Sequence, residues 1–293
     1  MNLNNTKLWT AVITPMNQDG SVDYESLKNV LKAQNEAGNG ILILGSTGEA
    51  LNIDEKEARE ILEFACNFEK TVPLMCGVGG INLKATSEWV DYLNTLNIDC
   101  YLVVTPLYAK PGDEGQYEWF KTLLDKANKP CMLYNVPSRT GKDMSLKACE
   151  KLIDHPKFWA IKEASGSVEK FSQYVQTCKN QSVYSGDDAL LPEFTKVGCK
   201  GLVSVAANVW PKETNLYTKK CLDNSLKETK LWEDASNSLF VASNPIPVKW
   251  LMSEVGQIKS PTLRAPLTVN DMNSMDTVKN SHQNITNWYR ENS

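Results

Sequence analysis

Lys162 is the residue whose position most directly suggests chemistry. It lies in the run Phe158–Glu163 (FWAIKE), which is otherwise largely apolar and is typical of a β-strand. Side chains alternate along a strand, so we expect Trp159 and Ile161 to pack against helices while Lys162 points into the interior. Lost hydration would lower its pKa and make a neutral, nucleophilic amine available for Schiff-base formation with a ketone. The alternative is a lysine that reaches solvent from the strand end or pairs with a carboxylate.

Polar groups of four residue types also lie at the C-terminal ends of predicted strands or directly after them. Tyr108 and Tyr134 carry hydroxyls that can pass protons, or they are ordinary core or rim aromatics. Ser46 and Thr47 stand between glycines and offer hydroxyls and backbone N–H groups to a carboxylate, although many strand-to-helix turns look like this. Arg139 can bind a second carboxylate through two parallel hydrogen bonds, or it is a solvated surface residue.

Composition excludes several classes of function. The chain has two histidines, His155 and His282, and neither lies beside a Ser, Cys or Glu motif, which argues against hydrolytic triads and histidine-rich zinc sites. A net charge of −4 gives no footprint for nucleic acid, and no apolar stretch approaches the length of a membrane span. The eight cysteines contain no CxxC and fall partly in apolar runs, which is typical of a reduced, cytoplasmic protein.

Short apolar runs alternate with longer amphipathic segments along the chain. The predicted strands are Leu8–Thr14, Gly40–Leu44, Val72–Val78, Cys100–Thr105, Cys131–Asn135, Phe158–Glu163, Ser182–Ser185 and Gly201–Val205. Each strand leaves room for a helix after it, which predicts an α/β fold. We expect a (β/α)8 TIM barrel with a C-terminal helical extension, and a doubly wound open sheet is the main alternative. We expect the barrel to occupy residues 1–225 and the extension, packed on the barrel, to occupy residues 226–293.

Helix signals support this reading of the first half of the chain. Asp23–Ala37 and Asp54–Lys70 carry apolar residues at helical spacing. Asp54 begins a sequence that resembles a capping box, and Gly38 is a stop signal.

Taken together, the motifs resemble the dihydrodipicolinate synthase branch of the pyruvate-dependent aldolase superfamily, over nearly the whole chain. The motifs are GSTGE at 45–49, TPLYAKP at 105–111, YNVPSRTG at 134–141, IKEASG at 161–166, SGDD at 185–188, GLVSVAAN at 201–208 and NPIPVKW at 244–250. Their order and spacing make a chance match very unlikely.

The resemblance implies a set of catalytic residues. Lys162 matches the lysine that forms the Schiff base, and Tyr134 matches the tyrosine that passes protons to and from the bound substrate. Ser46 stands where a threonine of the proton relay is usual, and its hydroxyl preserves that function. Tyr108 matches the relay tyrosine that is shared across a tight dimer.

The resemblance also implies binding residues. Thr47 matches the residue that holds the pyruvate carboxylate, Val203 matches a backbone contact to pyruvate, and Gly186 lies in the same pocket. Arg139 matches the arginine that receives the carboxylate of aspartate semialdehyde. N-acetylneuraminate lyases and keto-deoxy sugar acid aldolases usually lack this arginine in the YNVPSRTG context, so they are the second-ranked interpretation.

The implied reaction is condensation of pyruvate with L-aspartate 4-semialdehyde through a covalent Schiff base, without cofactor or metal. A relay tyrosine shared between subunits implies a homo-oligomer, at least a dimer, and the family default is a homotetramer. Leu107 stands where many members have a tyrosine that borders the inhibitory lysine site, so we expect feedback inhibition by L-lysine to be weak or absent. A catalytically silent barrel is disfavoured because the lysine, the tyrosines and the hydroxyls are all present.

Overall fold

A computed structural model describes residues 3–293. Within that range, eight parallel strands close into a barrel in the order of the sequence, with the last strand paired to the first. The strands are β1 (Leu8–Ala11), β2 (Gly40–Ile43), β3 (Leu74–Val78), β4 (Cys100–Val104), β5 (Cys131–Asn135), β6 (Phe158–Glu163), β7 (Ser182–Ser185) and β8 (Leu202–Ser204). The predicted TIM barrel is therefore confirmed, with β5, β6 and β7 at the predicted bounds and β1 ending three residues earlier.

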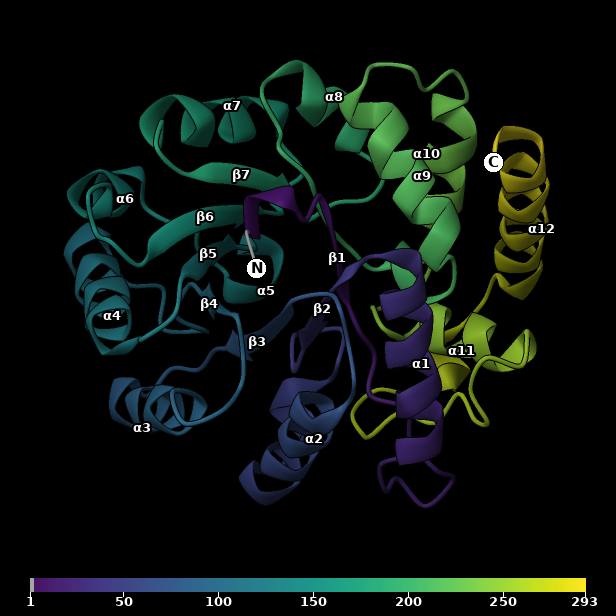
Figure 1. Cartoon of the computed structure of the whole chain (residues 1–293), viewed down its shortest axis with the longest axis horizontal. Coiled ribbons are helices and arrows are strands. Elements are labelled where there is room, and N and C mark those ends of the chain that lie inside the picture. The colour runs from purple at the N-terminus through teal and green to yellow at the C-terminus, as the bar shows by residue number, and fades with distance from the viewer. Residues whose placement is uncertain (1–2) are drawn as a thin grey trace.

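Helices surround this barrel (Figure 1). They are α1 (Tyr24–Ala37), α2 (Glu55–Asn67), α3 (Leu83–Leu93), α4 (Asp113–Lys126), α5 (Pro137–Thr140), α6 (Leu146–Leu152), α7 (Val168–Thr177), α8 (Leu191–Lys196) and α9 (Pro211–Leu222). Short 3-10 helices are η1 (Leu3–Asn5), η2 (Ala50–Asn52), η3 (Ala206–Asn208) and η4 (Val269–Asp271). The predicted starts of two helices are confirmed, because Asp23 caps α1 and Asp54 accepts the N–H of Glu57 at the start of α2.

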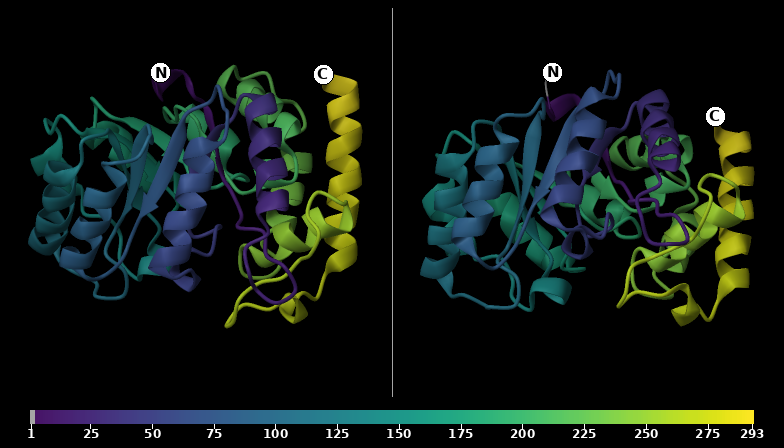
Figure 2. Two further views of the ribbon diagram at one scale, coloured as in Figure 1. Left: turned by 60° about the horizontal axis from the view of Figure 1, so that its bottom comes forward. Right: turned by 90° about the horizontal axis from the view of Figure 1, so that it is seen from below.

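The C-terminal extension consists of α10 (Thr229–Ser238), α11 (Ile246–Glu254) and α12 (Met275–Asn292). The predicted boundary at residues 225 and 226 falls in the loop between α9 and α10 and stays a prediction; residues 1 and 2 of the predicted barrel lie outside the described range. Figure 2 shows α11 and the loop after it at the end of the barrel toward which the strand arrows point. The extension therefore lies beside the end of the barrel where such folds place their active sites.

Two layers of apolar side chains form the core. Strand residues that face inward fill the barrel, among them Trp9, Leu42, Met75, Leu102 and Met132, and the opposite faces of the strands pack against the helices. None of the helices within residues 3–293 has the length and apolar character needed to cross a membrane.

The predicted orientation of Trp159 is wrong. The pairing of β5 and β6 shifts between Cys131 and Met132, so Trp159 is an extra residue in the ladder. Its ring turns toward the barrel interior, with its centroid 6.2 Å from that of Trp9 and 5.9 Å from that of Tyr184. Alternation resumes after this bulge, so Ile161 and Lys162 keep their predicted faces.

Candidate active site

Lys162 lies near the C-terminal end of β6 and points into the barrel. Its side chain is 5% exposed, so the alternative of a lysine that reaches solvent is wrong. Its Nζ lies 4.3 Å from the ring centroid of Tyr134, the residue paired with it in register on β5. Burial lowers the pKa of Lys162 to about 7, with Asp188 acting in the opposite direction and the charge of Arg139 adding to the decrease. A neutral amine is therefore well populated near pH 7.

Gly186, directly after β7, leaves room for this lysine. A Cβ atom at position 186 would lie 2.8 Å from Cε of Lys162 and 2.8 Å from Cβ of Ala164. Both distances are shorter than carbon atoms tolerate, so any larger residue would displace the lysine.

Tyr134 lies between Lys162 and the turn that follows β2. Burial raises the pKa of Tyr134 to about 12, although the charge of Arg139 and hydrogen bonding with Ser46 act to lower it. The phenol is therefore protonated at neutral pH and can give a proton before it takes one back. The structure thus places the hydroxyl of Ser46 next to the tyrosine, as the predicted relay requires.

The C-terminal extension contacts both predicted carboxylate-binding residues. Thr47 is buried, and its Oγ1 accepts a hydrogen bond from Nδ2 of Asn244 at 3.0 Å. Arg139, in α5, is exposed and donates from Nη2 to the carbonyl oxygen of Asn244 at 3.0 Å. A guanidinium has five N–H donors, so this bond leaves others for a ligand.

A cavity of about 700 Å³ opens beside these residues. Its wall includes Ser46, Tyr108, Tyr134 and Arg139 and is otherwise mainly apolar, as is usual for small-molecule sites. The other predicted site residues do not form part of this wall; they are Lys162, Thr47, Gly186 and Val203.

Tyr108 and Val203 occupy opposite environments. Tyr108 is 87% exposed and has a backbone φ of 62°, an unusual value for a residue with a side chain. Val203 lies on β8 among the side chains that fill the barrel and is 1% exposed. Within the described chain, Lys162 thus lies beside both Tyr134 and Gly186, whereas Tyr108 lies at the rim.

Asp188 and Asn244 belong to the site, although no role was predicted for them from the sequence. The carboxylate of Asp188 is buried and accepts hydrogen bonds from the Ser204 hydroxyl and, at 2.9 Å, from the N–H of Val205. Burial raises its pKa to about 6, while these hydrogen bonds act to lower it. Both residues lie in motifs that were noted, SGDD and NPIPVKW.

Comparisons with known proteins agree with this geometry. The sequence model of the dihydrodipicolinate synthetase family matches residues 4–285. A 4-hydroxy-tetrahydrodipicolinate synthase of Francisella philomiragia is 47% identical over 287 residues, which cover 97% of each chain. One from Wolbachia pipientis is 43% identical over 98% of each chain.

Solved structures of dihydrodipicolinate synthases are also similar to this chain. The chloride-inhibited dihydrodipicolinate synthase of Acinetobacter baumannii, complexed with pyruvate, superposes with a TM-score of 0.90 at 31% identity, covering 96% of this chain and 99% of that one. The enzyme of Aquifex aeolicus gives 0.88 at 30% identity, covering 97% and 98%. The chain belongs to the dihydrodipicolinate synthetase family.

Proposed function

We propose that the chain condenses pyruvate with L-aspartate 4-semialdehyde through a Schiff base on Lys162. Its family makes it a lyase of the 4-hydroxy-tetrahydrodipicolinate synthase type, which serves the diaminopimelate and lysine pathway. The observation that carries the residue-level proposal is a buried lysine with a pKa of about 7, in contact with a tyrosine that remains protonated.

The first half-reaction activates pyruvate. The pyruvate carboxylate binds at Thr47 and contacts the backbone at Val203, beside Gly186, and the neutral amine of Lys162 attacks the keto carbon. Loss of water gives an iminium, which draws electrons from the neighbouring methyl group. A methyl proton then leaves along the relay of Tyr134, Ser46 and Tyr108, and an enamine forms.

The second half-reaction makes the carbon–carbon bond. The enamine carbon attacks the aldehyde of aspartate semialdehyde, whose carboxylate is held by Arg139, and the relay returns a proton to the new alkoxide. The amino group of the adduct then attacks the iminium carbon and displaces Lys162. The product leaves as hydroxy-tetrahydrodipicolinate, and the scheme uses no metal or nucleotide.

We propose a homo-oligomer, at least a dimer, with the homotetramer as the family default. Tyr108 is 87% exposed, and Leu51 and Ile81 in the wall of the same cavity are 77% and 55% exposed. Exposed apolar groups of this size are typical of interaction surfaces, and a second copy of the chain would cover them.

We also place the protein in the cytoplasm. All eight cysteines are free, which fits a reducing compartment. Weak or absent inhibition by L-lysine stays a prediction.

A coupled assay tests the function. Pyruvate and aspartate semialdehyde are supplied with the next reductase of lysine biosynthesis, and consumption of NADPH is followed. We expect turnover that disappears in Lys162→Ala. If no turnover occurs and pyruvate is still trapped on Lys162 by borohydride, the aldolase chemistry stands and the second substrate is a sugar-acid aldehyde instead.

A further inference from the structure

The turn that carries Ser46 and Thr47 has an unfavourable backbone at both ends. Leu44, before the turn, has a φ of 53°, and Glu49, at its end, has a φ of 56°. Residues with side chains adopt these angles only where surrounding contacts hold them. Backbone hydrogen bonds within the turn, from Gly48 and Ala50 to Gly45 and from Glu49 to Ser46, hold part of it, and contacts from other segments add to them.

One such contact, a buried ion pair, comes from α11. Nζ of Lys249 lies 2.7 Å from Oε1 of Glu49, and the side chains of both residues are 0% exposed. The second carboxylate oxygen, Oε2, accepts the backbone N–H of Arg264 at 3.2 Å. Both oxygens of Glu49 are thus bound by residues of the C-terminal extension, some 200 positions along the chain.

Neither charge of this pair is favourable alone at this depth. Burial lowers the pKa of Lys249, although the neighbouring Glu49 carboxylate acts to raise it. Removing one member of a buried ion pair leaves an uncompensated buried charge, which strongly destabilises the folded chain relative to the intact pair. The two residues therefore constrain each other, and with them the end of the turn.

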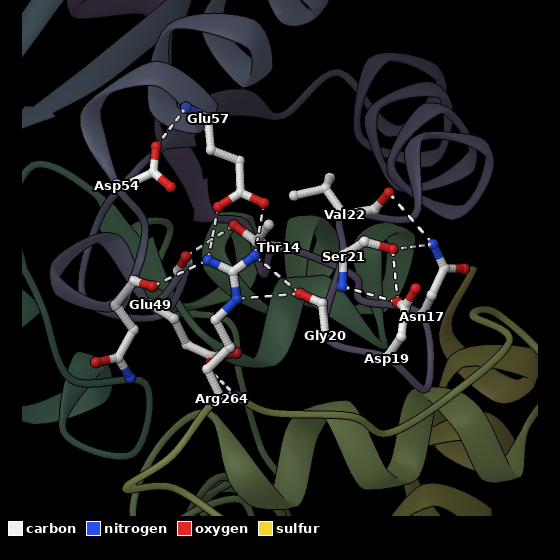
Figure 3. A network of polar contacts seen from close by, with 12 residues as sticks. Thr14, Asn17, Asp19, Gly20, Ser21, Val22, Glu49, Asp54, Glu57 and Arg264 are labelled. Carbon is white, nitrogen blue, oxygen red and sulfur yellow. Dashed lines mark hydrogen bonds and ion pairs between the residues drawn. The ribbon is translucent and has the colours of Figure 1, made fainter.

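The extension that supplies Lys249 is itself fixed to the barrel, as Figure 3 shows around Arg264. The guanidinium of Arg264 forms a bidentate ion pair with Glu57 of α2, with N–O distances of 2.5 and 2.6 Å. It also donates a hydrogen bond to the carbonyl oxygen of Gly20 at 2.8 Å. Asn244, just before α11, bonds to Thr47 at 3.0 Å. One segment of the extension therefore reaches the turn at two points.

We propose that the buried Glu49–Lys249 pair is a positioning device for the pyruvate-binding turn, which makes α11 part of the framework of the active site. Neither residue touches substrate; the pair acts through the backbone of Ser46 and Thr47. The inference rests on the proposed binding of pyruvate at this turn.

The test measures the pyruvate concentration that gives half-maximal borohydride trapping on the enzyme. In Lys249→Met and in Glu49→Gln it should rise about ten-fold or more, because misplacing a binding group by about 1 Å can cost about a hundred-fold. Glu49→Gln/Lys249→Met should show about the same increase as the single variants, since each removes the same interaction. The double variant buries no lone charge, so it carries the test if the single variants do not fold.

Lys279→Met is the matched control. Lys279 of α12 pairs with Glu254 of α11 at 2.8 Å, but its side chain is 53% exposed, so its loss should leave pyruvate binding unchanged. A pair that only stabilises the fold would reduce the amount of trapped enzyme and leave the half-saturating concentration unchanged, which would overturn the inference. Effects that multiply in the double variant would overturn it too. A wild-type chain that traps no pyruvate would instead contradict the proposed function, and the inference with it.

Discussion

Lys162 and Tyr134 are register partners on neighbouring strands, and Nζ of the lysine lies 4.3 Å from the centroid of the tyrosine ring. The aromatic face favours a cation, so this contact would stabilise the positive iminium of the proposed Schiff base. The hydroxyl of the same ring belongs to the predicted relay. In the proposed mechanism, one side chain would thus serve charge stabilisation and proton transfer at successive steps.

Tyr134→Phe separates these two contributions. The ring and its contact with Lys162 remain, while the proton-carrying hydroxyl is lost, so we expect kcat to fall by about 10²–10⁴-fold. Pyruvate should still be trapped by borohydride, because attack by the amine needs only the neutral lysine. Wild-type kcat in this variant would remove Tyr134 from the relay.

Gly186→Ala tests the space around the lysine. The added methyl group would meet Cε of Lys162 at 2.8 Å, so the amine must move, and we expect kcat to fall by about a hundred-fold. Gly112→Ala is the matched control, because a Cβ there meets nothing within 4 Å and the residue caps α4 with a φ of −74°. Steady-state kinetics that show equal activity for both variants would contradict this packing.

Arg139→Ala should weaken binding of the second substrate. Loss of a hydrogen-bonded charge costs about 1.5–3 kcal/mol, so we expect the KM for aspartate semialdehyde to rise about 10- to 100-fold. Arg139→Lys should recover only part of this loss, because an ammonium cannot form the parallel pair of bonds. An unchanged KM with full pyruvate trapping would assign the carboxylate to another residue.

The lowered pKa of Lys162 has a cost in stability. Below about pH 7 the lysine is charged in both folded and unfolded chains, and the folded state bears the full penalty of the buried charge. Between that value and the ordinary value of 10.5, only the unfolded chain holds the proton, so the wild-type free energy of unfolding rises with pH.

Lys162→Met should therefore be more stable than wild type by a few kcal/mol at or below pH 7, since each unit of pKa is about 1.4 kcal/mol. The gain should shrink as the pH approaches 10.5. Urea unfolding at several pH values measures this difference, and a constant or growing gain would contradict a buried lysine with a lowered pKa.

Local patterns predicted the strands and helix starts because the physics there is local. Apolar runs bounded by polar turns predicted β5 and β6 at their observed bounds. The Asp54 side chain, which caps α2, predicted where that helix begins. Trp159 was placed wrongly because a bulge depends on the neighbouring strand. The pairing of Glu49 with Lys249 was beyond sequence patterns, since it forms only when the extension folds back onto the barrel.

Residue types and spacing proposed Lys162 as a nucleophile but left the solvent-exposed alternative open. The family resemblance predicted the other site residues but not Asp188 or Asn244. The effect of Asp188 on Lys162 and the bond of Asn244 to Thr47 depend on distance and burial. These quantities are properties of the packed barrel and not of a single motif.

The central claim is that the amine of Lys162 forms the covalent bond to pyruvate. The most direct measurement adds borohydride to the enzyme with pyruvate and locates the reduced adduct by peptide mass spectrometry. We predict one pyruvate per chain, attached to Lys162, and no adduct in Lys162→Met. An adduct on another lysine, or equal trapping in Lys162→Met, would contradict the account.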